Sequence, residues 1–198
     1  LQDKIINSIL SKFPNLKVVL KNQYIEICSK ESEVLDIIKE LKLNSIFKFD
    51  QLIDLTAIDY PSKENRFEII YLLLSMKINQ RLAVKTEIKE DVSLDSIVPI
   101  HRSANWYERE CYDLFGIKFK NHPDLRRILT DYNFEGHPLR KDFPLTGNTE
   151  VRYDDLEKKV IYEPVKLIQE YRNFDYMSPW EGLDNKLIGD DKNESNEN

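Results

Sequence analysis

The amino-acid sequence predicts an α+β fold, in which helices cover a mixed β-sheet, followed by a long extended C-terminal arm. Up to about residue 117 the apolar residues recur at helical and strand spacings in turn, which indicates a compact domain. All five glycines and five of the eight prolines lie after residue 115, where this periodicity is lost. We therefore expect a compact α+β domain at 1–117, an extended arm at 118–183 and a polar, frayed tail at 184–198.

The first part of the predicted domain contains a hairpin and a helix. Residues 16–20 and 24–28 are short strand-like runs, and the three polar residues 21–23 between them predict a β-hairpin. Residues 32–41 carry apolar side chains at helical spacing, with Ser32 as the expected N-cap. The whole domain is expected to follow the order helix, strands, helix, strands, helix.

Three further runs predict the central strands of the sheet, at 52–58, 66–76 and 81–89. The middle of 66–76 is entirely apolar, which favours a strand that is covered on both faces. Residues 81–89 alternate between polar and apolar, so one face of that strand is expected to meet solvent. The short link at 79–80 predicts that these last two strands pair antiparallel.

The best helix prediction is at 103–115. Ser103 is the expected N-cap, and Gly116 is expected to end the helix in a left-handed conformation. Residues at i, i+4, i+7 and i+8 form one apolar stripe, made of Tyr107, Cys111, Leu114 and Phe115.

The charged residues of this helix are predicted to lie in two places. Glu108, Arg109 and Asp113 are expected to point away from the apolar stripe. Glu110 falls at the edge of the stripe and is expected to be half-buried. A half-buried carboxylate needs a cation or hydrogen-bond donors, so the helix is expected to dock something polar.

The predicted arm is rich in aromatic residues, prolines and paired opposite charges but has little periodicity. Such a segment cannot easily build a core of its own, yet it is too aromatic for plain disorder. Aromatic and arginine side chains in a non-periodic segment are typical of binding anchors. We expect an arm that becomes ordered by wrapping a partner.

Composition limits the classes of function. The chain is 41% hydrophobic and 32% charged, which is typical of a globular protein. Its net charge of −6 argues against nucleic acid as the main partner, because phosphate binding needs a concentrated basic surface. The longest apolar run, 69–74, is much shorter than the roughly 20 residues that span a bilayer, so no direct membrane span is expected. Cys28 and Cys111 are interpreted as free, buried thiols.

Catalytic and metal sites are the less favoured interpretations of the polar residues. Cys111, His122 and His137 fit no standard zinc spacing, so a structural role is favoured. Glu108, Glu110 and Asp113 could form an acid–base cluster. An ion-pair network is favoured instead, since no nucleophile or cofactor motif accompanies them.

The basic and tryptophan residues of the arm and the preceding helix are interpreted in the same way. The pair Arg126-Arg127 and the run at 140–142 are expected to pair with carboxylates rather than with phosphate. Trp106 and Trp180 are interpreted as packing anchors rather than as an electron-transfer route.

Five blocks of the sequence carry a resemblance to a known family. They are 108–117 (Glu-Arg-Glu-Cys-Tyr-Asp-Leu-Phe-Gly-Ile), 122–129 (His-Pro-Asp-Leu-Arg-Arg-Ile-Leu), 136–147, 150–155 and 178–181. Together they resemble the thirty-kilodalton subunit family of respiratory complex I, the proton-pumping NADH:ubiquinone oxidoreductase. The later blocks look most like the mitochondrially encoded members of that family.

The resemblance implies a structural and assembly subunit of the hydrophilic arm, with no catalytic, cofactor-binding or metal-binding residues of its own. NADH, flavin, iron–sulfur clusters and ubiquinone belong to the parent complex. The implied partners are the other subunits, chiefly the forty-nine-kilodalton quinone-site subunit, which the arm wraps, and neighbouring iron–sulfur subunits. The implied location is the matrix side of the mitochondrial inner membrane, with the cytoplasmic side of a bacterial membrane as the alternative. A free-standing adaptor or a small soluble enzyme using Glu108, Glu110 and Asp113 remain the competing hypotheses.

The resemblance also implies which residues meet the partner. The expected interface residues are Glu108, Arg109, Glu110, Asp113, His122, Asp124, Arg126, Arg127, His137, Arg140, Lys141, Asp142 and Trp180. Within this set, Glu110 needs a positive partner, and Arg126 and Arg127 are the candidates in this chain. The turn at 122–123 is expected either to bring them back alongside the helix or to direct their segment to the neighbouring subunit.

Overall fold

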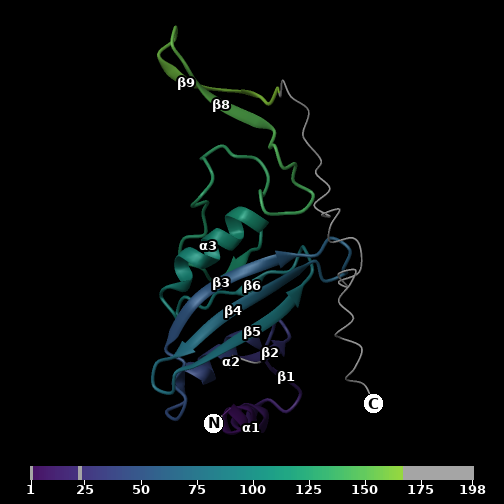
Figure 1. Ribbon diagram of the computed structural model, residues 1–198, viewed down its shortest axis with the longest axis vertical. Helices are drawn as coiled ribbons and strands as arrows, with labels where there is room; N and C mark the ends of the chain where they lie inside the picture. Colours follow the sequence, from purple (N-terminus) through teal and green to yellow (C-terminus); the bar gives the residue numbers. More distant parts are fainter. Residues whose placement is uncertain (1, 22–23, 167–198) are drawn as a thin grey trace, which may run out of the picture. The chain divides into compact units, whose positions relative to one another are not determined.

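The computed structural model describes residues 2–21 and 24–166 (Figure 1). Contacts within the chain divide it into two units, Leu1–Asn148 and Thr149–Asn198. The first unit therefore continues about 30 residues beyond the expected boundary at 117. Trp180, the expected tail at 184–198 and the last part of the expected arm lie outside the described residues.

The first unit is built on a five-stranded sheet with the order β1-β2-β5-β4-β3. Its strands are β1 (Lys17–Leu20), β2 (Tyr24–Ser29), β3 (Gln51–Asp59), β4 (Phe67–Ser75) and β5 (Gln80–Ile88). Three neighbouring pairs are antiparallel, including the predicted hairpin β1–β2 and the predicted pair β4–β5. The pair β2–β5 is parallel, so the sheet is mixed, as the sequence predicts.

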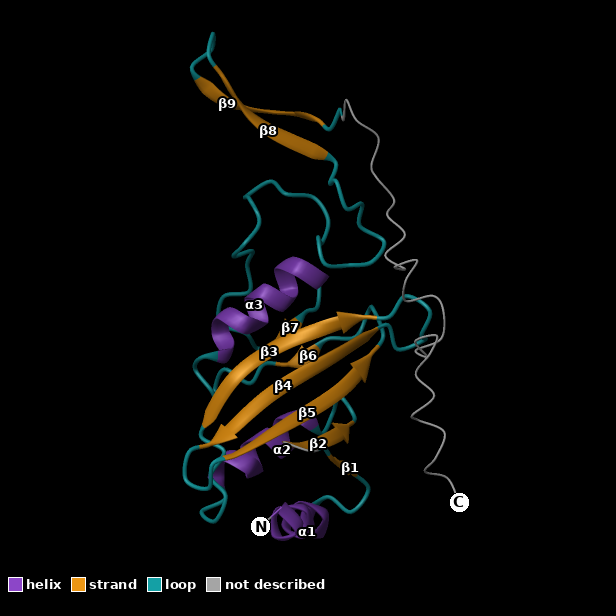
Figure 2. Cartoon of the chain, in the orientation of Figure 1, coloured by secondary structure: helices purple, strands orange, loops and turns teal. Residues whose placement is uncertain are grey.

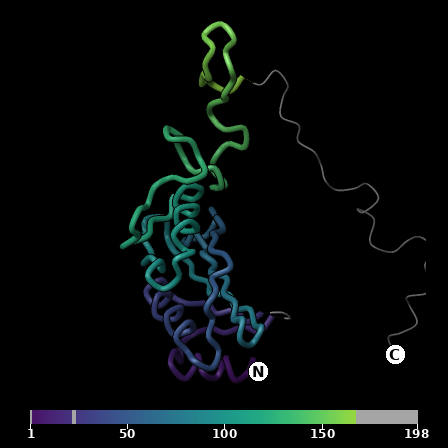
Figure 3. Tube along the Cα trace, turned by 90° about the vertical axis from the view of Figure 1, so that its left-hand side faces the viewer, coloured from purple at the N-terminus to yellow at the C-terminus, as the bar shows by residue number. Residues whose placement is uncertain are grey.

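The helices α2 and α3 cover one face of this sheet, as the two perpendicular views agree (Figures 2 and 3). The three helices are α1 (Gln2–Lys12), α2 (Val34–Leu43) and α3 (Ala104–Phe115). Two short parallel strands, β6 (Leu94–Asp95) and β7 (Phe119–Lys120), flank α3 in the sequence. The α+β fold class is confirmed. In the part of the chain that the structure describes, no helix is long and apolar enough to cross a membrane.

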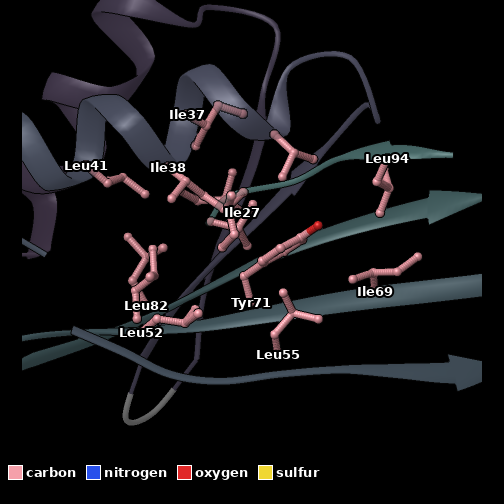
Figure 4. Packing of buried hydrophobic residues seen from close by; sticks show 14 of the residues in the cluster. Ile27, Ile37, Ile38, Leu41, Leu52, Leu55, Ile69, Tyr71, Leu82 and Leu94 are labelled. Atoms are coloured by element: carbon pink, nitrogen blue, oxygen red, sulfur yellow. The ribbon is translucent and has the colours of Figure 1, made fainter. Parts of the chain in front are cut away.

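The core lies between the sheet and its helices. Ile37, Ile38 and Leu41 of α2 lie against side chains of the strands, among them the fully buried Tyr71 (Figure 4). Along β4 the buried side chains alternate with half-buried ones. The prediction that this strand is covered on both faces is therefore wrong. Within the first unit α2 and α3 lie on one face, and the apolar Ile70, Leu72 and Leu74 are only half-buried on the other (Figures 2 and 3).

The helix ends agree with the sequence in part. Gly116 ends α3 with φ +81°, and its N–H donates to the Tyr112 carbonyl at 2.9 Å, as predicted. Ser103 occupies the N-cap position of α3, but its hydroxyl makes no capping hydrogen bond. The N-cap of α2 is Glu33 and not Ser32. Neither α2 nor α3 therefore begins with a side-chain capping hydrogen bond.

The second unit contains an antiparallel hairpin, β8 (Thr149–Asp154) and β9 (Lys159–Pro164). This stretch was expected to belong to an irregular arm, so neither strand was predicted. That the chain here wraps a partner stays a prediction.

Two neighbouring isoleucines on β4 test the one-sided burial. Ile69→Ala is expected to lower the free energy of unfolding by about 2–5 kcal/mol, because the side chain is fully buried and its removal leaves a cavity. Ile70→Ala, on the half-buried face, is expected to lower it by about 1 kcal/mol or less. Urea denaturation of the purified chain measures both, and equal losses would contradict the assignment of the two faces.

Candidate functional site

The polar side of α3 is buried under the segment 122–142 of the same chain. Asp113 is the centre of this contact, and its side chain is fully buried. One carboxylate oxygen, Oδ2, accepts the backbone N–H groups of Ile128, Leu129 and Thr130 at 3.0, 2.7 and 2.8 Å. The other, Oδ1, accepts the Thr130 hydroxyl at 2.5 Å and Arg127 Nη1 at 2.8 Å.

Although burial raises the pKa of Asp113, these five donors outweigh it and hold that pKa well below its ordinary value. Asp113 is therefore ionised at any physiological pH. Its charge organises the backbone of residues 128–130, a role that leaves it no free oxygen for acid–base chemistry.

Two arginines complete the attachment of the segment. Arg127 also donates to the Gly136 carbonyl at 3.0 Å. Arg109 of α3 is buried and donates to the carbonyls of Arg126 and Arg127 at 3.2 and 3.1 Å. Each guanidinium therefore crosslinks backbone that is distant in sequence, which a planar group with several fixed donors does well.

The C-terminal end of α3 is attached by a second group of contacts. His137 Nδ1 lies 2.9 Å from the Asp113 carbonyl, and Arg140 Nε donates to the Phe115 carbonyl at 2.5 Å. A side chain at Gly116 would place its Cβ 2.6 Å from Arg140 Nη2 and 2.7 Å from His137 Nε2. Gly116 is thus required both by its positive φ and by the close approach of these two side chains.

A second buried carboxylate, Asp59 at the end of β3, holds the distal part of the segment. It pairs with Arg66 at 2.8 and 3.0 Å and accepts the Lys141 N–H at 2.8 Å. Arg66 reaches Asp142 at 2.9 Å as well. We call Asp113 and Asp59 the two anchor carboxylates, because they fix the segment 122–142 to α3 and to the sheet.

Glu108 occupies a different buried position. Its Oε1 accepts the Ile97 N–H at 2.7 Å, and Oε2 has no hydrogen-bond partner among the described residues. His122 Nε2 lies 3.9 Å from Oε2 but faces the Asn105 carbonyl at 3.1 Å, while Nδ1 accepts the Asp124 N–H. This pattern indicates a neutral His122 that carries its proton on Nε2. Burial raises the pKa of Glu108 to about 7.

The structure corrects several sequence interpretations of α3. Glu108, Arg109 and Asp113 were expected to point away from the apolar stripe, and all three are buried. The following segment covers Arg109 and Asp113, whereas Glu108 bonds the Ile97 N–H, which precedes the helix. Glu110 is half-buried, as expected, yet it pairs with neither Arg126 nor Arg127. Arg126 forms an exposed ion pair with Asp124 at 2.7 Å. Trp106 was interpreted as a packing anchor but is 70% exposed.

The three acidic residues of α3 therefore do not converge. Glu108 contacts the chain near β6, Asp113 contacts residues 127–130, and Glu110 faces Asp54 of β3. Among residues 2–21 and 24–166, no group of three or more His, Cys, Asp or Glu side chains could hold a metal ion. Cys111 is buried and Cys28 is half-buried, and both thiols are free.

The anchor carboxylate Asp59 and its partner Arg66 were not among the predicted site residues. The available signal was an acidic residue at the end of a strand, after the apolar Ala57 and Ile58, followed seven residues later by a basic one at the start of the next predicted strand. The predicted residues Arg140, Lys141 and Asp142 do lie together with this pair.

The anchor function of Asp113 can be tested by Asp113→Asn. An amide leaves Arg127 without its buried counter-charge, so the free energy of unfolding is expected to fall by about 3–5 kcal/mol. Hydrogen exchange at the amides of residues 128–130 is expected to accelerate. The control Asp124→Asn removes an exposed ion pair and is expected to leave both measurements almost unchanged. Unaltered protection at 128–130 in Asp113→Asn would contradict the anchor.

Glu108 predicts a pH dependence of stability. Its pKa is raised from the ordinary 4.5 to about 7, so between these values the folded chain keeps a proton that the unfolded chain releases. The free energy of unfolding should therefore fall as pH rises through this window and stay lower above it. Glu108→Gln should reduce this fall and be more stable than the parent chain at pH 8. Urea titrations at pH 5 and pH 8 measure this, with the exposed Glu31→Gln as control, and an unchanged slope in Glu108→Gln would refute it.

Comparisons with known proteins agree with this architecture. A family model described as "Respiratory-chain NADH dehydrogenase, 30 Kd subunit" matches residues 27–149. The chain is similar to a subunit of the NADH-quinone oxidoreductase of the bacterium Ruegeria pomeroyi, 57% identical over 163 residues, 82% of each chain. The corresponding protein from Roseobacter denitrificans is 52% identical over 173 residues, 87% of each chain.

A solved structure is similar as well. A chain from the membrane-bound sulfane sulfur reductase, an archaeal respiratory membrane complex, superposes with a TM-score of 0.65 and 27% identity. The match covers 73% of this chain and 86% of that chain. The family match spans more than half of the sequence and includes the anchored segment. The chain therefore belongs to the family of the 30 kDa subunit of respiratory-chain NADH dehydrogenase.

Proposed function

We propose that this chain is a non-catalytic structural and assembly subunit in the peripheral arm of an NADH:quinone oxidoreductase, where it supports electron transfer from NADH to ubiquinone coupled to proton pumping. NADH, flavin, iron–sulfur clusters and quinone are then bound by other subunits. The partners are chiefly the forty-nine-kilodalton quinone-site subunit and neighbouring iron–sulfur subunits. The proposal that the chain is part of such a complex is supported by its family and by its similarity to bacterial NADH-quinone oxidoreductase subunits.

The observation that carries the scaffold role is the amphipathic hairpin β8–β9. Val151 pairs with Tyr162, and Tyr153 pairs with Val160. Directly paired residues and residues two apart lie on the same face of a ladder, so these four side chains share one face. They are 55–60% exposed.

The other face of the hairpin is mainly charged, and Ile161 is the apolar residue on it, opposite Arg152. Arg152 pairs with Glu163 across the strands at 2.5 Å. An isolated two-stranded hairpin is marginally stable in water, and an exposed apolar face commonly marks an interaction site. The hairpin is therefore suited to pack its apolar face on another protein.

The buried charges argue against the enzyme alternative. The carboxylates of Asp113 and Asp59 are occupied by backbone amides and arginines, and Glu108 lies on a different side of α3. A general acid–base pair needs groups that converge on a substrate, and these groups point to separate parts of the chain. A free-standing adaptor could also use the apolar face of the hairpin β8–β9 to bind a partner. The family relationship, however, supports a subunit of the complex and not a free-standing adaptor.

The resemblance of the later blocks to mitochondrially encoded members supports a place on the matrix side of the mitochondrial inner membrane. The two relatives named above are bacterial, which supports the cytoplasmic side of a bacterial membrane as the alternative. In both cases the chain lies in the peripheral arm, held through its partners.

The hairpin tests the proposal in cells that assemble the complex. Tyr153→Ser with Val160→Ser should lower the amount of assembled complex at least about tenfold, as expected when an interface anchor is lost. NADH:quinone turnover per assembled complex should stay normal. The control Arg152→Gln alters only the polar face and should assemble normally. Normal assembly of the double variant with a sharp loss of turnover per complex would contradict a non-catalytic role.

A further inference from the structure

A groove runs along the outer face of α3, between this helix and residues 128–129. It encloses about 770 Å³ and is lined chiefly by Arg102, Trp106, Tyr107, Glu110, Ile128 and Leu129. The sequence did not predict this groove as a site, although Glu110 was considered as part of an acid–base cluster.

The walls of the groove are apolar and exposed. Trp106 is 70% exposed and Leu129 is 62% exposed. Tryptophan side chains are seldom left exposed to solvent, and they are frequent at the centre of protein–protein interfaces. Two such side chains on opposite walls are suited to hold an apolar segment between them.

The walls are also fixed before any partner arrives. The Tyr107 hydroxyl donates to the Ile53 carbonyl at 2.9 Å, which holds its ring against β3. The N–H groups of Ile128 and Leu129 are bound by the anchor carboxylate Asp113. A wall that is already ordered reduces the entropy lost on binding.

The groove is lined by one carboxylate, Glu110, and by one guanidinium, Arg102, and among the described residues no ion pair joins the two. Glu110 is half-buried in it, and Asp54 of β3 lies close enough to affect Glu110 electrostatically. Burial first, and Asp54 second, raise the pKa of Glu110. Among the described residues no basic side chain forms an ion pair with either carboxylate. A cation supplied from outside would therefore relieve both burial and like-charge repulsion.

We propose, building on the scaffold function above, that this groove binds an arginine-bearing apolar segment of a neighbouring subunit. The apolar side chains of that segment pack between Trp106 and Leu129. Its guanidinium stacks on Trp106 and pairs with Glu110. Arginine fits better than lysine, because a planar guanidinium can stack on an indole and bind a carboxylate through two donors. Anionic lipid headgroups are disfavoured by the same two carboxylates.

The experiment uses the assembled complex and matched variants. Trp106→Ala and Glu110→Arg are each expected to lower the amount of assembled complex on native gels about tenfold or more. Glu110→Gln keeps the shape and removes the charge, so we expect a smaller loss relative to the parent chain, and this difference should shrink as salt concentration rises and screens the ion pair of the parent. Met76→Ala and Glu135→Gln change an exposed apolar and an exposed acidic residue elsewhere and should assemble normally.

A structure of the assembled complex identifies the occupant. The expected result is an arginine of another subunit within about 4 Å of the Glu110 carboxylate. Changing that arginine to glutamate should restore assembly to Glu110→Arg. A groove filled by solvent, by lipid or by residues 167–198 of this chain overturns the inference, as does failure of the charge exchange. If the hairpin variant fails to assemble while Trp106→Ala and Glu110→Arg assemble normally, only the groove is refuted and the scaffold function stands.

Discussion

The five hydrogen bonds accepted by the buried Asp113 carboxylate are the interaction on which the surface of this protein depends. They fix an irregular segment, which has no sheet or helix of its own, against the polar side of α3. The bound backbone then forms one wall of the groove beside Trp106. Asp59 repeats the arrangement at the far end of the segment, where it binds Arg66 and the Lys141 N–H. Charges that would otherwise be expensive to bury are each matched by several donors, so they can order a loop that apolar packing alone could not.

Much of the first unit could be predicted because its elements are specified locally. The strands at 52–58, 66–76 and 81–89 follow from apolar runs, and Gly116 follows from the left-handed conformation that ends α3. The placement of Glu108, Arg109 and Asp113 could not be predicted in this way. Periodicity shows that a helix face is polar, but not whether solvent or another part of the chain lies against it. Here the segment 122–142 covers Arg109 and Asp113 through hydrogen bonds between residues up to 25 positions apart, and Glu108 is bound by the Ile97 N–H before the helix.

The hairpin β8–β9, unlike the burial of the charged residues of α3, could have been predicted from the sequence pattern. Val151 and Tyr153 alternate with charged residues, and the run of Val160, Ile161 and Tyr162 has strand character and is flanked by Lys159 and Glu163. The abundance of aromatic residues and prolines around it favoured an irregular arm instead. The exposure of Trp106 could not be predicted from its residue type and position either. A tryptophan on a helix next to an apolar stripe is usually packed, yet this one lies outside the core. Both features are exposed and apolar, as the proposed docking of neighbouring subunits requires.

The anchored segment is thus bound to α3 and to the sheet of the same chain, whereas we propose that the hairpin and the groove become covered only in the complex. Hydrogen exchange of the free chain and of the assembled complex, compared amide by amide, tests this difference most directly. The amides of residues 128–130, bound to Asp113, should be equally protected in both states. The amides of the hairpin at 149–164 should gain strong protection on assembly, because an isolated two-stranded ladder opens readily. Rapid exchange at 128–130 in the free chain, or identical exchange of the hairpin in both states, would contradict this division.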